Sequence, residues 1–380
     1  MSNTKICFIV TDAITFNMLY RDQLEYFRDH TNFDVTLVCG GSDKHFEILS
    51  NRRVGKIFNA KLVRKPSPVK DFESLILLIS YFTNNKFDLV VYSTPKALLL
   101  GSLATSLTRH KNTIAIIRGR AYENYNGKKR YFYQLLDKIS LINSKQVIFI
   151  SKSLMNAYLE ENIIAKRKSF LLGSGSSNGV NTEKFKPANL LGKRDKDLSN
   201  NTKKFIVLVA GRICPDKGLY DLAEVIKLVK NKNIIFRLVG PIEDINSEKF
   251  LEKLKIEHPN IEHIPFSKSI EDYFQQADLH LFLTHREGFG NVAIEAASCG
   301  IPTFAYNVIG VKDSVKEGVS GKKFDFGDTR SIASAIDYAA TNPNFKAQYS
   351  SARLWVTNNF SQNKVWDNYL KFYKNSLPTK

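Results

Sequence analysis

The sequence predicts an α/β fold made of two doubly wound parallel sheets. Short and almost wholly apolar runs of strand length recur along the 380 residues, separated by stretches with helical periodicity. Strands that are apolar on both sides need helices over both faces of their sheet, which is typical of parallel sheets. A polar stretch at 188–204 interrupts the alternation, which then restarts. The sequence therefore predicts two such domains in succession.

Residues 1–187 are expected to form the first domain. The apolar runs that predict its strands lie at 5–10, 34–39, 88–93, 113–118, 146–151 and 169–173. Helical periodicity between these runs predicts helices at 17–30, 72–82 and 130–142.

Residues 188–204 are a linker by composition, and residues 205–360 are expected to form the second domain. Its predicted strands lie at 205–211, 234–240, 261–266, 279–284, 302–307 and 322–326, with helices at 219–230 and 330–341. The last segment, 361–380, contains an amphipathic helix at 363–375, which we expect to pack back on the N-terminal domain.

Composition excludes several classes of protein. Hydrophobic residues make up 43% of the chain and charged residues 24%, as in globular proteins. The four cysteines have no CxxC spacing and the seven histidines no ligand-like spacing, so we expect buried thiols and no metal site. No secretory signal is recognisable, and no apolar run approaches the roughly 20 residues of a membrane span. The sequence predicts a cytoplasmic protein.

The positive charge is concentrated in the first half of the chain. Residues 1–190 carry 28 Lys and Arg against 15 Asp and Glu, whereas the rest carries 27 against 22. This imbalance indicates an anionic partner, for which nucleic acid, an anionic membrane surface and a phosphate-bearing lipid all remain open. A lysine-rich surface that only contacts solvent is the alternative.

The stretch "HREGFGNVAIEAASCGIP" (285–302) has the pattern of a ligand-binding loop at the end of a strand. Gly288 and Gly290 allow close approach of the backbone. Asn291 is the predicted N-cap of the next helix, where the N–H groups of residues 291–293 suit an anion. Glu287 before the glycines and Glu295 inside the helix can each accept hydrogen bonds from hydroxyl groups. The spacing predicts a nucleotide sugar as the ligand.

This stretch resembles the donor-binding motif of the family 4 glycosyltransferases, which are retaining enzymes of the GT-B fold, with two Rossmann-like domains facing each other across a cleft. The resemblance implies that Glu287 contacts the donor sugar and Glu295 the ribose hydroxyls. Family members usually have a proline where this chain has Leu283. The backbone that would hold the sugar and phosphate belongs to Gly288, Phe289, Gly290, Asn291 and Val292.

A second element, "AGRICPDKGLYDL" (210–222), resembles the GR…KG motif of the same family. The resemblance implies that Arg212, at a strand end, and Lys217, in the first turn of the next helix, neutralise the donor diphosphate. Gly211 belongs to the same donor-binding set. Two fixed cations at a leaving diphosphate stabilise the charge that develops as the glycosidic bond breaks.

Weaker matches extend the resemblance over most of the chain. "NGVNTEKFKP" (178–187) and the region around "AIIRGRAYENYNGKKRYFY" resemble members that build capsular and O-antigen polysaccharides. Many members have a histidine where this chain has "IIRGR". Either Arg118 or Arg120 is expected to replace it, binding a phosphate or an acceptor group. The loop 11–17, with Asp12, is expected to hold the acceptor.

The resemblance implies a retaining, metal-independent glycosyltransferase with no cofactor. The expected donor is a UDP-hexose or UDP-N-acetylhexosamine, although users of GDP-mannose share these motifs. The expected acceptor is a polyprenyl-diphosphate-linked glycan for a cell-surface polysaccharide, at the inner face of the plasma membrane, with no nucleic acid involved. Two alternatives remain: a non-catalytic binder of nucleic acid or another anionic polymer, for which "GKKRYFY" (127–133) is the candidate element, and a GT-B epimerase or phosphorylase.

Overall fold

The computed structural model describes residues 4–120, 122–123, 125–191 and 204–377. Its internal contacts divide the chain into two compact units, residues 1–178 with 363–380, and residues 179–362. The first unit ends before residue 187 because the segment after Asn178 is bonded to the second: Val180 pairs with Ser361, and the Ser298 hydroxyl donates to the carbonyl of Phe185. Of the predicted linker, 188–191 form a short 3-10 helix, and residues 192–203 lie outside the described residues.

The first unit contains a parallel seven-stranded sheet with the strand order β3-β2-β1-β4-β5-β6-β7. The strands are β1 (Thr4–Asp12), β2 (Phe33–Gly40), β3 (Lys56–Asn59), β4 (Leu89–Ser93), β5 (Thr113–Ile117), β6 (Gln146–Phe149) and β7 (Ser169–Leu171). All strands predicted for this region are confirmed, and β3 was missed. It is a short edge strand whose residues are exposed or half-buried, so it lacks the apolar run that identified the others.

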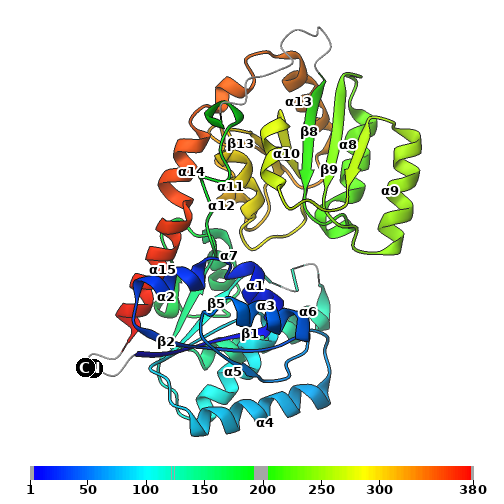
Figure 1. The fold of residues 1–380 in the computed structure, drawn as a ribbon. Helices are drawn as coiled ribbons and strands as arrows, with labels where there is room; N and C mark the ends of the chain where they lie inside the picture. The colour runs from blue at the N-terminus through cyan, green and yellow to red at the C-terminus, as the bar shows by residue number, and fades with distance from the viewer. Residues whose placement is uncertain (1–3, 121, 124, 192–203, 378–380) are drawn as a thin grey trace. The chain divides into compact units, whose positions relative to one another are not determined.

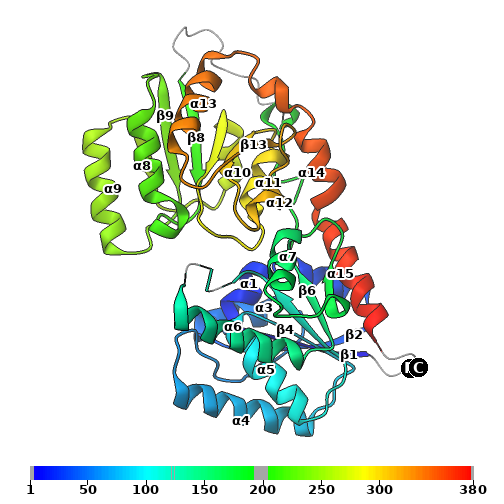
Figure 2. The same cartoon turned by 180° about the vertical axis from the view of Figure 1, so that it is seen from behind.

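Helices cover both faces of this sheet. They are α1 (Ala13–Leu19), α2 (Gln23–His30), α3 (Asp43–Asn51), α4 (Pro68–Asn84), α5 (Pro95–Leu107), α6 (Gly127–Ile142) and α7 (Lys152–Glu160). Helices α4, α5 and α6 lie on one face and α1 and α3 on the other (Figures 1 and 2), as right-handed crossovers require. The helix predicted at 17–30 is in fact two helices, because the chain turns at Asp22, whose φ is 60°.

The C-terminal helix α15 (Gln362–Ser376) packs on the first unit. The Tyr373 ring lies 5.8 Å from that of Phe8 in β1, and the Trp366 ring lies 5.2 Å from that of Tyr26 in α2. The indole of Trp366 also donates to the side chain of Asn178 at 2.7 Å. This is the return of the last helix to the N-terminal sheet that the sequence predicted.

The second unit contains a parallel six-stranded sheet with the order β10-β9-β8-β11-β12-β13, which confirms the second predicted alternation. The strands are β8 (Phe205–Ala210), β9 (Ile234–Val239), β10 (Ile261–Ile264), β11 (Leu279–Phe282), β12 (Thr303–Tyr306) and β13 (Gly321–Phe324). Its helices are α8 (Leu219–Leu228), α9 (Ile245–Glu257), α10 (Ile270–Gln276), α11 (Asn291–Ser298), α12 (Val311–Ser314), α13 (Thr329–Thr341) and α14 (Ala352–Phe360).

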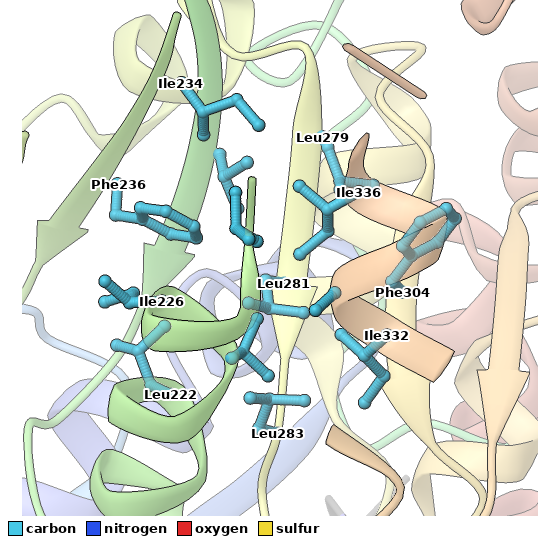
Figure 3. Close-up of a cluster of buried hydrophobic side chains, with 14 of the residues drawn as sticks. Leu222, Ile226, Ile234, Phe236, Leu279, Leu281, Leu283, Phe304, Ile332 and Ile336 are labelled. Carbon is cyan, nitrogen blue, oxygen red and sulfur yellow. The ribbon is translucent and has the colours of Figure 1, made fainter. Parts of the chain in front are cut away.

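One hydrophobic core fixes the central strands of the second unit (Figure 3). Leu279 and Leu281 of β11 point to the face covered by α8 and α13, where they are buried with Ile226 and Ile336. Phe282, the next residue after Leu281, points to the opposite face and packs among buried residues of α11 and α12. Each such buried side chain contributes about 1.5–3 kcal/mol. The core therefore holds the carboxyl end of β11, and the loop that follows it, in a fixed position.

Candidate active site

A cavity of about 490 Å³ lies within the second unit at the carboxyl ends of β8, β9 and β11. Crevices at this end of a parallel sheet are the usual ligand sites of doubly wound folds. Most of the residues predicted to bind the donor line it, namely Gly211, Arg212, Lys217, Glu287, Gly290, Asn291, Val292 and Glu295. Two motifs about 70 residues apart in the sequence thus meet in one cavity.

Lys217 and Glu287 form an ion pair in this cavity. Both side chains are largely buried, with 21% and 24% of their surfaces exposed. The Lys217 ammonium also lies 3.4 Å from the hydroxyl of Thr284, which in turn donates to the carbonyl of Arg286. The lysine is consequently held against the loop 284–287 by contacts with two of its side chains.

A second pair joins the same two segments. Asp216 accepts a hydrogen bond from Nε of Arg286 at 2.8 Å, and the carbonyl of Asp216 accepts from the amide of His285 at 3.0 Å. Sequence reasoning missed this pair, because neither residue belongs to the glycine–glutamate pattern. Lys217 itself ends a 3-10 helix (Pro215–Lys217) and precedes α8, which begins at Leu219, so the prediction that it lies in the first turn of that helix is wrong.

Arg212 lies at the rim of the cavity with half of its side chain exposed. It pairs at 2.5 Å with Glu243, which belongs to the loop between β9 and α9. The amide of Ile213 donates to the carbonyl of Pro241 in the same loop at 2.9 Å. The guanidinium therefore faces solvent and the cavity from a backbone that is fixed to the neighbouring strand.

Glu295 lines the cavity from α11, four residues after the start of the helix. Burial is the main reason that the pKa of this carboxyl is raised to about 7; Lys184 lowers the pKa and the neighbouring Glu271 raises it by smaller amounts. Within the described parts of the chain, no group donates a hydrogen bond to the Glu295 carboxyl. A half-buried acceptor that lines the cavity and has no donor is suited to hydroxyl groups of a ligand.

The start of α11 differs from the prediction. Gly290, with φ of 89°, is the N-cap, and Asn291 is the first helical residue. The amide of Ala293 donates to the carbonyl of Gly290 at 3.1 Å, so it is not one of the free N–H groups that were expected there. A Cβ on Gly290 would approach Phe282 to 2.8 Å, so this position needs glycine for conformation and for space.

Two residues of the motif do not line the cavity. Phe289 is buried and packs on Phe360, with ring centroids 5.2 Å apart, so it anchors the loop to α14. Gly288 lies beneath Gly310, where an added Cβ would come within 2.8 Å of the Gly288 carbonyl carbon. Sequence reasoning missed Gly310, because its contact with the loop depends on the return of the chain after β12.

The cavity also has walls that the motifs did not predict. Gly240 and Pro241 follow β9, and Phe266 and Ser267 follow β10. Phe266 is 71% exposed and presents an aromatic ring at the cavity. Their place after the carboxyl ends of predicted strands was the signal that could have identified them.

The candidate residues of the first unit are in different environments. Asp12 caps α1 by accepting from the amide of Ile14 at 3.0 Å, so most of the expected acceptor loop 11–17 is helical. Arg120 is buried in ion pairs with Glu123 and Glu161 at 2.5 and 2.6 Å. The Arg118 guanidinium lies 4.6 Å from the centroid of the Tyr20 ring, and its three nitrogens are buried without a hydrogen-bond partner among the described residues.

The described residues contain neither a candidate metal site nor a candidate membrane span. No group of three or more His, Cys, Asp or Glu side chains in this part of the chain could hold a metal ion. None of the described helices has the length and hydropathy needed to cross a membrane. The four cysteines are free and buried, as predicted.

Comparisons with known proteins identify the family of the chain. The model of the family described as glycosyl transferases group 1 matches residues 193–353. The capsular polysaccharide biosynthesis glycosyltransferase CapM of Staphylococcus aureus is 31% identical over 383 residues, which cover 99% of this chain and 98% of that protein. An Escherichia coli enzyme, UDP-Gal:alpha-D-GlcNAc-diphosphoundecaprenol alpha-1,3-galactosyltransferase, is 24% identical over 348 residues, or 90% of this chain and 89% of that protein.

The fold of the chain matches that of a solved structure. The structure of Anabaena Alr3699/HepE in complex with UDP matches with a TM-score of 0.78 at 16% identity, covering 98% of this chain and 100% of that chain. The likeness to CapM along nearly the whole chain, together with the family match over the second unit, shows the family. The chain belongs to the group 1 glycosyl transferases and has their GT-B fold.

Proposed function

We propose that this glycosyltransferase moves a hexose or N-acetylhexosamine from a UDP-sugar to a hydroxyl of a polyprenyl-diphosphate-linked glycan, with retention of anomeric configuration and without a metal ion. The observation that carries the proposal is the meeting of Arg212, Lys217, Glu287 and Glu295 in one cavity. Two cations and two carboxylates in that cavity match the diphosphate and the two hydroxylated rings of such a donor.

Each of these residues would contact a different part of the donor. Glu295, an acceptor without a donor of its own among the described residues, suits the ribose hydroxyls. Phe266, exposed where it lines the cavity, offers a stacking face to the uracil. Lys217 and Arg212 suit the diphosphate, and Glu287 suits the hydroxyls of the transferred sugar. UDP is favoured over GDP because the Anabaena structure contains UDP and the Escherichia coli relative uses UDP-Gal.

The transfer step needs no carboxylate pair of the glycosidase kind. The acceptor hydroxyl attacks the anomeric carbon on the face from which the diphosphate departs, and a phosphate oxygen takes the hydroxyl proton. Negative charge grows on the diphosphate as its bond to the sugar breaks. Fixed cations at Arg212 and Lys217 stabilise that charge more in the transition state than in the ground state, which is the condition for catalysis.

The acceptor assignment rests on the relatives and on charge. CapM is named for capsular polysaccharide biosynthesis, and the Escherichia coli enzyme is named for a GlcNAc-diphosphoundecaprenol acceptor. The excess of Lys and Arg in residues 1–190 suits a diphosphate-bearing lipid and an anionic membrane. Arg118, whose guanidinium nitrogens are buried without a hydrogen-bond partner among the described residues, is the proposed contact for a phosphate or another anionic group of the acceptor.

A transfer assay tests this proposal. The protein is incubated in EDTA with UDP-glucose, UDP-galactose, their N-acetylamino forms or GDP-mannose, and with a synthetic alkyl-diphosphate-linked N-acetylglucosamine. We expect one UDP-sugar to yield a disaccharide product whose new linkage, examined by proton NMR, keeps the α configuration of the donor. A β linkage would overturn the retaining mechanism, and activity that requires added Mg²⁺ or Mn²⁺ would overturn metal independence.

The alternatives predict other products. An epimerase would convert the UDP-sugar without an acceptor, and a phosphorylase would need inorganic phosphate in place of a nucleotide. A non-catalytic polymer binder would leave every donor intact while binding DNA or RNA tightly at moderate salt. Each of these results is distinguishable from transfer in the same set of reactions.

A further inference from the structure

The outward face of α4, α5 and α6 in the first unit exposes large apolar side chains. On α4, Val69, Phe72 and Ile76 are 72%, 65% and 50% exposed. On α6, the exposed residues are Tyr131, Phe132, Leu135 and Ile142, and on α5 Leu107 is exposed at the C-terminal end. Helix α5 packs against both α4 and α6, so these residues share one helical layer (Figures 1 and 2). We call the eight residues the apolar face.

The apolar side chains follow helical spacing. Positions 69, 72 and 76 of α4 lie on the side opposite to Ser74, Leu78 and Phe82, which are buried under the sheet. In α6, positions 131, 132, 135 and 142 lie opposite to the buried Ser140 and Leu141. The exposed residues are therefore two continuous stripes that point away from the sheet, and not single apolar residues scattered over a surface.

The charges around the α6 stripe are positive. Lys128, Lys129 and Lys138 are exposed beside it. Asp137 is the one acidic residue of this helix, and it faces inward, where the hydroxyl of Tyr158 donates to it at 2.5 Å. Arg130 is paired with Glu161 at 2.8 Å, which leaves the lysines as the solvent-facing charges of the helix. An apolar stripe with aromatic residues and flanking lysines has the composition of a helix that lies in a lipid interface.

The N-terminal end of α4 adds a basic hollow. A cavity of about 680 Å³ is lined there by Lys61, Arg64, Lys65 and Lys70, together with Asp12 and Glu73. Arg64 lies 3.5 Å from Asp12 and remains 62% exposed. Four cations against two carboxylates leave this hollow positive, and it is large enough for a phosphate headgroup beside the stripe of α4.

We propose that the apolar face docks on the surface of an anionic lipid bilayer, with its apolar side chains among the headgroups and the flanking lysines on anionic lipids. Charge complementarity selects this occupant, because residues 1–190 carry 28 basic against 15 acidic side chains. The proposal rests on the proposed function in one respect: a lipid-linked acceptor gives the enzyme a reason to be at a membrane. Docking on this face places the acceptor-binding unit on the bilayer that carries the acceptor.

Flotation with lipid vesicles tests the proposal on the full-length protein. Vesicles of phosphatidylcholine with phosphatidylglycerol are compared with pure phosphatidylcholine. We expect wild type to float with the anionic vesicles. The double variant that carries Phe132→Ser and Leu135→Ser should bind these vesicles more weakly, by about tenfold or more. The matched control is Ile256→Ser with Leu354→Ser, two residues of the second unit that are 83% and 63% exposed. This control should bind vesicles as wild type does.

Other outcomes overturn the proposal. Equal flotation of both double variants would show that the apolar face does not touch lipid. Equal binding of wild type to vesicles with and without phosphatidylglycerol would also contradict the proposal. Loss of a wild-type dimer in the α6 variant, measured by light scattering, would assign the face to a second copy of the chain. Selective loss of RNA binding would assign it to nucleic acid.

Titration of the UDP-sugar keeps the two proposals separate. The α6 variant should bind it as wild type does, because the donor cavity lies wholly within the second unit. Vesicle binding that depends on α6 in a protein that binds no nucleotide would leave the docking face standing and refute the proposed function. Sugar transfer by a protein that does not bind vesicles would refute the docking face and leave the proposed function standing.

Discussion

The Lys217 ammonium and the Glu287 carboxylate form an ion pair in the cavity at the carboxyl ends of β8 and β11. Each residue was identified separately from its motif, but only the fold shows that the two charges neutralise each other. A donor diphosphate entering this cavity would compete with Glu287 for the lysine. The pair therefore couples the proposed sugar contact to the proposed phosphate contact.

Glu287→Gln should separate substrate binding from chemistry. The substitution keeps the shape of the side chain and frees the charge of Lys217 for the diphosphate. We expect the affinity for UDP to stay equal or to rise, while kcat for sugar transfer falls about 100-fold because the sugar loses a positioning contact. Titration calorimetry and transfer kinetics on one preparation measure both. Weaker UDP binding with unchanged kcat would refute the assigned roles.

Glu295 should make donor binding depend on pH near neutrality. Burial raises the pKa of this carboxyl to about 7, so acidification through that value protonates it. The ionised form accepts stronger hydrogen bonds from ribose hydroxyls, so affinity should fall as the pH decreases. We expect the Kd for UDP-glucose, measured by calorimetry, to be about tenfold higher at pH 6 than at pH 8. UDP-glucose is preferred to UDP because it lacks a terminal phosphate that titrates in this range.

Glu295→Gln is the matched control for that pH dependence. Its Kd should change little between pH 6 and pH 8 and should resemble the wild-type value at the lower pH. A wild-type Kd that is flat over this range, or a variant that keeps the slope, would show that Glu295 does not contact the donor in its ionised form.

Gly310→Ala should weaken donor binding although it replaces none of the residues that are proposed to contact the ligand. A Cβ at this position would lie 2.6 Å from the carbonyl oxygen of Glu287, so the loop must shift. Gly318→Ala is the control: both glycines have positive φ (82° and 68°), but a Cβ at Gly318 meets nothing within 4 Å. Both variants carry about 1 kcal/mol of backbone strain. Only Gly310→Ala should also raise the Kd for UDP-glucose, by roughly tenfold; equal values would contradict the loop contact.

Arg118 and Arg120 should respond to the same substitution in different ways. Arg118→Met removes a cation whose nitrogens have no hydrogen-bond partner within the described residues, so unfolding free energy should stay within about 1 kcal/mol of wild type. Arg120→Met leaves Glu123 and Glu161 without their buried cation and should cost about 1–3 kcal/mol. Urea denaturation measures both. Arg118→Met should nonetheless lose transfer activity while keeping its affinity for UDP-glucose; full activity would exclude Arg118 from the acceptor site.

Burial on both faces explains how much of the fold the sequence predicted. Strands such as β4 and β5 are buried at every position and mostly apolar, so each can be recognised without knowledge of its neighbours. Strand β3 was missed because it lies at the sheet edge, and the turn at Asp22 was missed because apolar spacing continues across it. The local sequence pattern predicts buried strands well, but it predicts edge strands and turns poorly.

The site was predictable to the extent that its residues lie in short motifs. Arg212, Lys217, Glu287 and Glu295 line the cavity, whereas Phe289 serves the core. A motif does not distinguish a side chain that contacts ligand from one that holds the loop. The ion pair of Asp216 with Arg286 and the packing of Gly310 on residues 287–288 join segments far apart in sequence, so a single sequence gives no signal for them.

The most direct test of the account is the titration of UDP, in EDTA, into wild type, Lys217→Met and Lys227→Met. Lys227 is a matched control because it belongs to the same unit and pairs with Glu224 on the surface at 3.0 Å. Loss of a charged hydrogen-bond donor costs about 1.5–3 kcal/mol. UDP should bind wild type and Lys227→Met equally and Lys217→Met about 10- to 150-fold more weakly. No binding of UDP to folded wild-type protein, or equal binding to all three, would contradict the claim that this cavity holds the donor diphosphate.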